Sequence, residues 1–209
     1  IVSGGCAINC RYCFRRHFPY ADNNPGRARW QEALDYIAAD PSITEVIYSG
    51  GDPLNAPDRQ LAWLTERVAA IPHVKRLRVH SRLPIVLPNR IDDDCLDWLT
   101  GHGLHTTLVI HSNHPRELDD SVGAALGRLR RAGITLLKRA VLLRGINDQA
   151  STLAALSEGL FDRGVLPYYL HLLDPVAGAH HFDVPEAEAR ALMDHLRARL
   201  PGYLVPRLV

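Results

Sequence analysis

Apolar residues recur at helical spacing in some segments and form short unbroken runs in others. Trp30, Leu34 and Ile37 lie three or four residues apart, which predicts a helix over 29–39 that ends before Pro41. The same spacing predicts further helices at 58–70, 92–99, 119–132, 150–163 and 185–200. The apolar runs predict strands at 45–48, 76–80, 104–110, 135–143 and 167–173, with Ile1-Val2 as the stub of a first strand.

Strands that alternate with helices over short connections indicate parallel β-α units. Right-handed crossovers wind such units around one sheet. About six units fit in this chain, too few for an eight-unit barrel of typical size. We therefore predict an α/β fold, a partial (βα)6 TIM-like barrel, with a doubly wound open sheet as the alternative. In both folds the loops after the strands form the working face.

The composition suits a single domain that spans 1–209, with 46% hydrophobic residues. The 24 basic and 23 acidic residues give a net charge of +1, so no basic field favours nucleic acid. No apolar run is long enough to span a membrane, and no signal peptide is visible. We expect a cytoplasmic protein, and a homo-oligomer is an open alternative. Because the chain begins at Ile1 and ends at Val209, we also expect a piece of a longer protein.

Three cysteines, Cys6, Cys10 and Cys13, have the spacing C-x3-C-x2-C near the start of the chain. A Gly-Gly pair precedes them and allows the tight turns that let thiolates face one point. Three thiolates can hold three irons of a [4Fe-4S] cluster, which leaves the fourth iron open to a small molecule. The alternatives are a zinc site, for which His17 is the nearby fourth ligand, and disulfides, which an odd triplet disfavours.

Other candidate residues follow the predicted strands. The turn Ser49, Gly50, Gly51 and Asp52 contains bare glycines that let backbone amides approach a ligand, and its acid can bind an ammonium or a hydroxyl. An ordinary turn is the alternative.

Two histidines follow the strand at 104–110. His111 and His114 are expected to cap the next helix or to bind a carboxylate, with a metal site as the alternative. Arg15 lies in an arginine cluster beside the cysteines, which indicates anion recognition or a solvated patch. Asp174 ends a strand, where an acid in a β-α barrel is more often functional than structural.

Together these residues resemble the radical S-adenosylmethionine (SAM) superfamily and, within it, the lysine 2,3-aminomutase family. The first and last matching segments are most similar to the branch that makes (R)-β-lysine for modification of elongation factor P. The segments that carry the resemblance are GGCAINCRYCFRRHFPY, YSGGDPL, HSRLPIVLPNRI, HSNHPREL, VLLRGINDQ and PYYLHLLDPVAGAHHFDV.

The resemblance implies that Cys6, Cys10 and Cys13 hold the cluster and that SAM binds its open iron. It implies cofactor contacts for Ser49, Gly50, Gly51, Asp52, Arg82 and His111. By the same resemblance, Arg15 holds the carboxylate of L-lysine and Asp174 holds a substrate ammonium. A reductant such as flavodoxin or ferredoxin supplies an electron, and SAM yields a 5′-deoxyadenosyl radical that takes hydrogen from C3. Pyridoxal 5′-phosphate (PLP) carries the nitrogen from C2 to C3.

The chain departs from the family pattern in two ways. The PLP lysine of the family lies in a C-terminal segment, and we expect this segment to lie outside this chain. We expect the same of an N-terminal region. Neither Lys75 nor Lys138 occupies a matching motif. Lys138-Arg139-Ala140 also stands where the family more often has Asn-Gln-Ser, so Arg139 replaces an amide that would touch SAM. The alternatives are a radical SAM enzyme for another amino acid and a non-catalytic iron–sulfur module.

Overall fold

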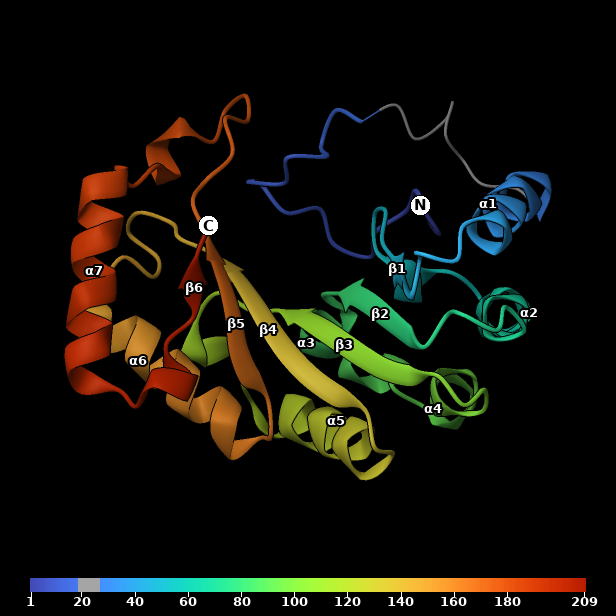
Figure 1. The fold of residues 1–209 in the computed structure, drawn as a ribbon. Helices are drawn as coiled ribbons and strands as arrows, with labels where there is room; N and C mark the ends of the chain where they lie inside the picture. Colours follow the sequence, from blue (N-terminus) through green and yellow to red (C-terminus); the bar gives the residue numbers. More distant parts are fainter. Residues whose placement is uncertain (19–26) are drawn as a thin grey trace.

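The fold is a parallel six-stranded sheet with helices packed along one side (Figure 1), seen in a computed structural model that describes residues 1–18 and 27–209. The strands are β1 Glu45–Tyr48, β2 Arg76–Ser81, β3 His105–His111, β4 Thr135–Val141, β5 Leu166–His171 and β6 Arg207–Leu208. The α-helices are α1 Arg27–Ala39, α2 Asp58–Ala69, α3 Leu83–Val86, α4 Asp93–Thr100, α5 Asp120–Arg131, α6 Ala150–Asp162 and α7 Glu186–Arg199. Short 3-10 turns lie at Pro53–Asn55, Pro88–Arg90, Pro115–Glu117, His180–Phe182 and Gly202–Leu204.

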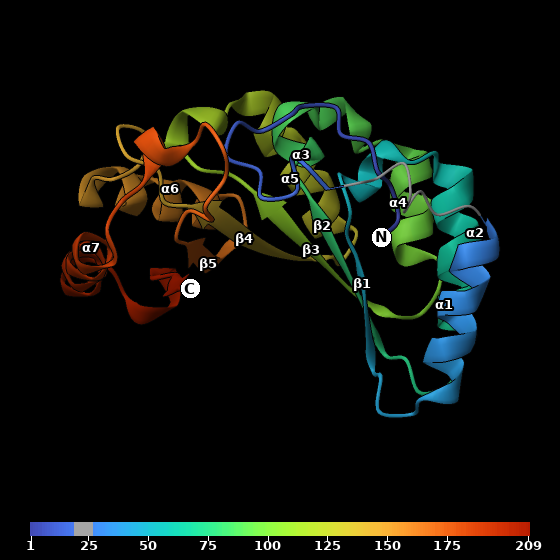
Figure 2. The same ribbon diagram turned by 90° about the horizontal axis from the view of Figure 1, so that it is seen from above.

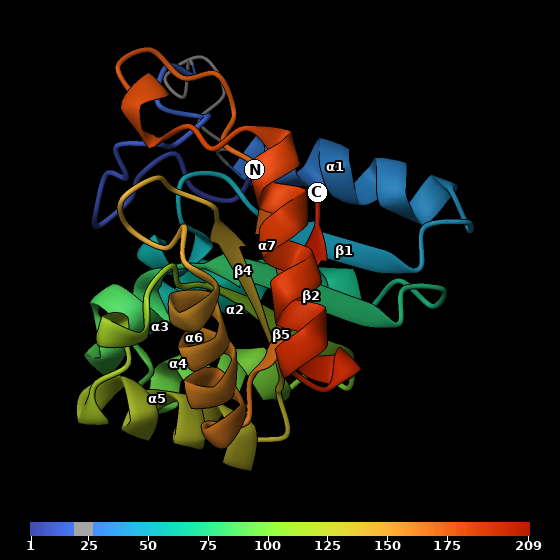
Figure 3. The same ribbon diagram turned by 90° about the vertical axis from the view of Figure 1, so that its left-hand side faces the viewer.

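The sheet is an open arc. Its strands lie in sequence order, from β1 to β6, and every neighbouring pair is parallel. Figure 2 shows the arc from above, with helices along its outer side and the inner side open. At one edge, α7 packs beside α6 (Figure 3). The partial barrel is therefore confirmed, since a doubly wound sheet would carry helices on both faces.

The predicted elements are present with ends shifted by a few residues, but two strand assignments differ. Ile1-Val2 is not a strand of the sheet: Ser3 forms an isolated parallel bridge with Gly50, and the Val2 amide donates to the Ser49 carbonyl at 2.8 Å. The sixth strand is β6 instead, beside β5, and its two residues are too few to show a period. Pro19 and Tyr20, which end the first motif, lie outside the described residues.

The core lies between the sheet and the helices. Along β3, Leu108 and Ile110 are fully buried on the helix side, while Thr107 and His111 alternate with them on the other side. Asp92 caps α4 by accepting a hydrogen bond from the Cys95 amide at 2.9 Å. None of the helices in the described residues combines the length and the hydropathy that a membrane crossing requires.

Candidate active site

A cavity of about 450 Å³ opens where the strands end, and it gathers residues from the cysteine segment and from the loops after the strands. Its wall includes ten of the eleven predicted site residues: Cys6, Cys10, Cys13, Arg15, Gly50, Gly51, Asp52, Arg82, His111 and Asp174. The eleventh, Ser49, does not line the cavity, but it accepts a hydrogen bond from Arg15, which does. The structure thus brings together residues that are more than 160 positions apart in the sequence.

The turn after β1 holds the cysteine segment in place through backbone contacts. The Gly51 amide donates to the Ser3 carbonyl at 2.7 Å, and the Asp52 amide donates to the Gly5 carbonyl at 2.9 Å. Both amides therefore bind protein in this structure, whereas the sequence predicted that amides of this turn approach a ligand.

Close backbone approach explains both glycines of this turn. A Cβ on Gly50 would lie 2.2 Å from the Ser3 carbonyl oxygen, and one on Gly51 would lie 2.4 Å from the Gly5 carbonyl oxygen. Gly50 also has φ +143°, a value that other residues rarely adopt. The glycines thus let the cysteine segment pack against the end of β1.

The Asp52 side chain joins the turn after β1 to the end of β2. It is 5% exposed, and its Oδ1 accepts from the Leu54 amide at 3.0 Å and from Ser81 Oγ at 2.7 Å. Its Oδ2 accepts from the Arg82 amide at 2.7 Å. Burial raises the pKa of this carboxyl, and the three hydrogen bonds act in the opposite direction. The carboxylate is occupied by protein donors in this structure.

The three thiols of the cysteine segment are all free and all line the cavity. Cys6 is exposed, and Cys10 and Cys13 are half-buried. Burial raises the pKa of Cys6 to about 11, with Asp52 and the other two thiols adding to the effect. Thiols spread around a wall suit a multi-iron cluster, which takes ligands at separate irons, better than a single zinc ion. The donor set therefore fits an iron–sulfur cluster.

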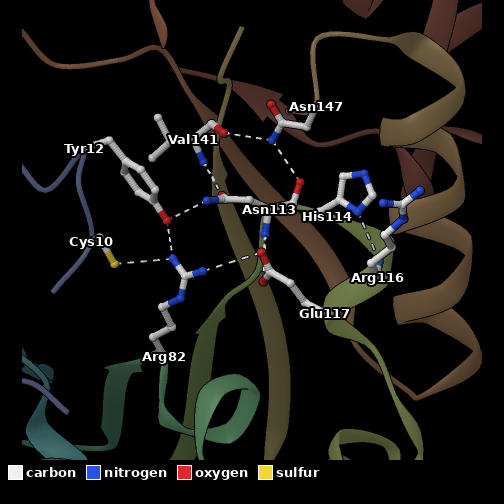
Figure 4. A network of polar contacts seen from close by, with 9 residues as sticks. All are labelled: Cys10, Tyr12, Arg82, Asn113, His114, Arg116, Glu117, Val141 and Asn147. Carbon is white, nitrogen blue, oxygen red and sulfur yellow. Dashed lines mark hydrogen bonds and ion pairs between the residues drawn. The ribbon is translucent and has the colours of Figure 1, made fainter. Parts of the chain in front are cut away.

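A hydrogen-bond network fixes the cysteine segment above the strand ends (Figure 4). Arg82 donates from Nη1 to Cys10 Sγ at 3.4 Å and to the Tyr12 hydroxyl, and Nη2 lies 3.5 Å from Glu117 Oε1. The Tyr12 hydroxyl also accepts from Asn113 Nδ2 at 2.6 Å. Arg82 thus contacts a predicted cluster ligand directly.

The network continues into β4 through two buried asparagines. The Val141 amide donates to Asn113 Oδ1 at 3.0 Å. Asn147, fully buried, donates from Nδ2 to the Asn113 and Val141 carbonyls at 2.9 Å, and its Oδ1 accepts from the Leu143 amide at 2.7 Å. The sequence pattern did not mark Tyr12 or these asparagines. The position of the two asparagines in the loops after β3 and β4 was a signal that could have marked them.

The predicted substrate residues differ in their surroundings. Arg15 donates from Nη1 to Ser49 Oγ at 2.8 Å and to the Gly50 carbonyl at 2.6 Å. Asp174 is exposed on the loop after β5. Arg15 and Asp174 thus place opposite charges on one cavity.

His114 has a local role, because its Nδ1 accepts from the Arg116 amide at 3.1 Å and caps a 3-10 turn.

Four adjacent strands each contribute a nitrogen-bearing side chain to the cavity wall: His80, His111, Arg139 and His171. Burial lowers the pKa of His80 to about 3, and Arg139 and Arg78 lower it further. Burial also holds the pKa of His111 well below its usual range, again with Arg139 contributing. The imidazoles are therefore neutral at pH 7, and the guanidinium carries the charge.

An open parallel barrel with three free cysteines at the carboxyl ends of its strands defines a class of enzyme that holds an iron–sulfur cluster at its working face. The chain belongs to the radical SAM superfamily, whose family description, "Radical SAM superfamily", matches residues 1–156. Membership in this superfamily implies a [4Fe-4S] cluster and SAM as cofactors.

Several relatives carry the name L-lysine 2,3-aminomutase. The protein from Escherichia coli (strain K12) is 55% identical over 208 residues, which cover 100% of this chain and 61% of that protein. The proteins from Haemophilus influenzae and from Buchnera aphidicola are 53% and 44% identical, each over 100% of this chain and 62% of the relative. The chain thus spans 61–62% of the length of these curated relatives.

Solved structures support the fold. Spore photoproduct lyase complexed with dinucleoside spore photoproduct aligns with a TM-score of 0.61 at 15% identity, over 95% of this chain and 72% of that chain. A radical SAM methyltransferase from Sphaerobacter thermophilus aligns with a TM-score of 0.56 at 18% identity, over 87% of this chain and 54% of that chain. At such identities the likeness concerns the fold alone.

Proposed function

We propose that this chain is the radical SAM core of an L-lysine 2,3-aminomutase, an isomerase that moves the 2-amino group of L-lysine to C3. The observation that carries the proposal is the 55% identity to a protein of that name over the whole of this chain, including the segment with Asp174. The cavity supports it, because cysteine, arginine and aspartate side chains from distant segments line one wall.

The cysteines have one task in this function. Cys6, Cys10 and Cys13 would hold the cluster, and Arg82 would fix the orientation of Cys10 through its hydrogen bond to Sγ. When bound, the cluster and SAM supply a 5′-deoxyadenosyl radical, and PLP carries the migrating amino group. The cysteine segment and the strand-end loops line the cavity in which this chemistry would take place.

The substrate residues have a different task. Arg15 retains Nε and Nη2 for a carboxylate, because its two hydrogen bonds to the turn after β1 leave from Nη1. Asp174 offers an exposed carboxylate to an ammonium group. Opposite charges on one cavity match a substrate that carries both a carboxylate and a distant amine.

We propose that the PLP lysine comes from outside residues 1–209. Lys138 is 1% exposed and does not line the cavity, and Lys75 is exposed just before the amino end of β2. These are the two lysines of the chain.

We further propose that residues 1–209 form a single domain and that a flavodoxin or ferredoxin is the reductant. We also propose that the protein is located in the cytoplasm and that its product serves to modify elongation factor P. The net charge of +1 supports a small-molecule substrate over nucleic acid.

The test uses the full protein that contains this chain, reconstituted with iron and sulfide without oxygen. We expect electron paramagnetic resonance of the reduced protein to show a four-iron signal that changes when SAM is added. With SAM, PLP, dithionite and L-lysine, chromatography should then detect β-lysine. Cys6→Ser is the matched control, because it removes one cluster ligand at an exposed position and should abolish the product.

Two results would contradict the proposal. A cluster signal that is indifferent to SAM would indicate an electron-transfer module. A signal that responds to SAM, without β-lysine but with conversion of another amino acid, would keep the superfamily chemistry and reject lysine as the substrate.

A further inference from the structure

Arg139 is a charged side chain in the cavity wall that lacks a protein counterion. It lies on β4, is partly buried and lines the cavity. Within the part of the chain that the structure describes, its guanidinium makes no hydrogen bond and no ion pair. A guanidinium has five donors in a planar fork, so an unpartnered one in a cavity wall is available to a ligand.

The charges around Arg139 also favour a bound anion. Burial lowers the pKa of Arg139 and Arg15 lowers it further, so two like charges face one cavity. Asp52 opposes this effect, but its carboxylate already accepts hydrogen bonds from Ser81 and from two backbone amides. The other carboxylate in the wall, Asp174, is exposed. The cavity therefore has an excess of positive charge that a bound anion would offset.

Two histidines beside Arg139 point to the same kind of ligand. His80 Nε2 and His111 Nε2 are buried and have no hydrogen-bond partner among the described residues. His111 is the register partner of Arg139 across β3 and β4, and His80 lies on β2 in the same wall. A neutral imidazole can donate one N–H, and buried donors are almost always satisfied in native structures. A ligand oxygen would satisfy these nitrogens.

We propose that Arg139 binds the carboxylate of an α-amino acid in the cavity, with His80 and His111 as neighbouring donors. A guanidinium fork holds a carboxylate through two parallel hydrogen bonds. Arg15 uses only Nη1 for Ser49 and the Gly50 carbonyl, so it remains available for the substrate carboxylate assigned to it above, and Arg139 would be a second guanidinium for a carboxylate in the same cavity.

Two ligands could supply the carboxylate. One is the methionine part of SAM, which follows from the superfamily. The other is the amino-acid substrate, which rests on the proposed function.

The experiment measures binding to the full, cluster-loaded protein by anaerobic calorimetry, with two pairs of probes. SAM is compared with 5′-methylthioadenosine, which lacks the amino-acid part, and L-lysine is compared with L-lysinamide, which lacks the carboxylate. Arg139→Met removes the charge at similar side-chain length. We expect this variant to weaken one carboxylate ligand by about 10- to 100-fold, the range for a hydrogen bond to a charged group. Its carboxylate-free counterpart should bind as before.

Two further variants control this result. Arg139→Lys keeps the charge and should recover part of the lost affinity, which a merely structural role would not predict. Arg144→Met removes an exposed arginine that pairs with Glu188 outside the cavity, and should bind all four probes normally. Circular dichroism confirms that each variant is folded.

The two pairs of probes separate the sources of the carboxylate. Loss for SAM alone assigns Arg139 to the methionine carboxylate, and loss for L-lysine alone assigns it to the substrate. The proposal is overturned if Arg139→Met weakens each carboxylate ligand and its carboxylate-free counterpart equally. It is also overturned if the variant changes the binding of no probe. If L-lysine fails to bind the unaltered protein, the proposed function fails, and the SAM pair still decides the role of Arg139.

Discussion

The two faces of the sheet differ sharply, although the same strands build both. Lys138 and Arg139 are consecutive on β4, yet Lys138 is 1% exposed on the side of Leu136 and Ala140, and Arg139 lines the cavity. The helix side is otherwise mostly apolar, whereas the cavity side carries imidazoles and guanidinium groups. Because successive side chains of a strand point to opposite faces of the sheet, one residue contributes to the packed core and the next one lines the cavity.

A cavity-forming change on the helix side should have the largest effect on stability. Leu108 is fully buried in the core on β3, and Leu108→Ala should lower the free energy of unfolding by about 3–5 kcal/mol, because it removes packing and leaves a void. Urea unfolding followed by circular dichroism measures the effect. Thr107→Ala, on the other face, should cost less than about 1 kcal/mol. Equal costs would contradict the division between the faces.

Lys138 is the exception on the helix side, and its replacement should stabilise the protein. Burial lowers the pKa of Lys138 from 10.5 to about 7, and Glu117 opposes the shift. Between pH 7 and 10.5 the unfolded chain binds a proton at Lys138 that the folded chain has lost, so stability rises with pH over this range. Lys138→Met should therefore raise the free energy of unfolding by about 4 kcal/mol at pH 7.

This gain should shrink as the pH approaches 10, because the unfolded chain then also loses the proton. Urea unfolding at the two pH values measures it. Lys75→Met is the matched control at an exposed position and should change little at either pH. A gain that is independent of pH would show that hydrophobic burial, and not the lysine charge, accounts for the difference.

The sequence predicted those parts of the molecule that depend on local pattern. Helical spacing found α1, and apolar runs found β1 to β5, because one face of each element is buried. The cysteine spacing marked the cavity. The strand β6 was not predicted, because it is defined by its pairing with β5 and its two residues are too few to show an apolar pattern. The packing role of Gly50 likewise depends on Ser3, whose approach the local sequence does not encode.

The site was predictable in position but not in contacts. Strand ends gather on one face of any parallel α/β fold, so His111 and Asp174 could be placed together from the sequence. The hydrogen bonds of Asn147 could not be predicted, since they join β4 to Asn113, the second residue after β3. The isolation of Arg139 was equally hidden, because it depends on what β2, β3 and β5 bring beside it.

On the cavity side, the smallest effect should come from the exposed Asp174. Asp174→Asn keeps the size of the side chain and removes its charge, so we expect L-lysine to bind about 10-fold more weakly through the lost contact with an ammonium. L-norleucine, which has the same carbon chain without the side-chain amine, should bind both proteins equally. Calorimetry with the two ligands measures the difference. Equal weakening of both ligands would show that Asp174 shapes the cavity and does not bind the amine, and the cavity side would then owe its selectivity to its cations alone.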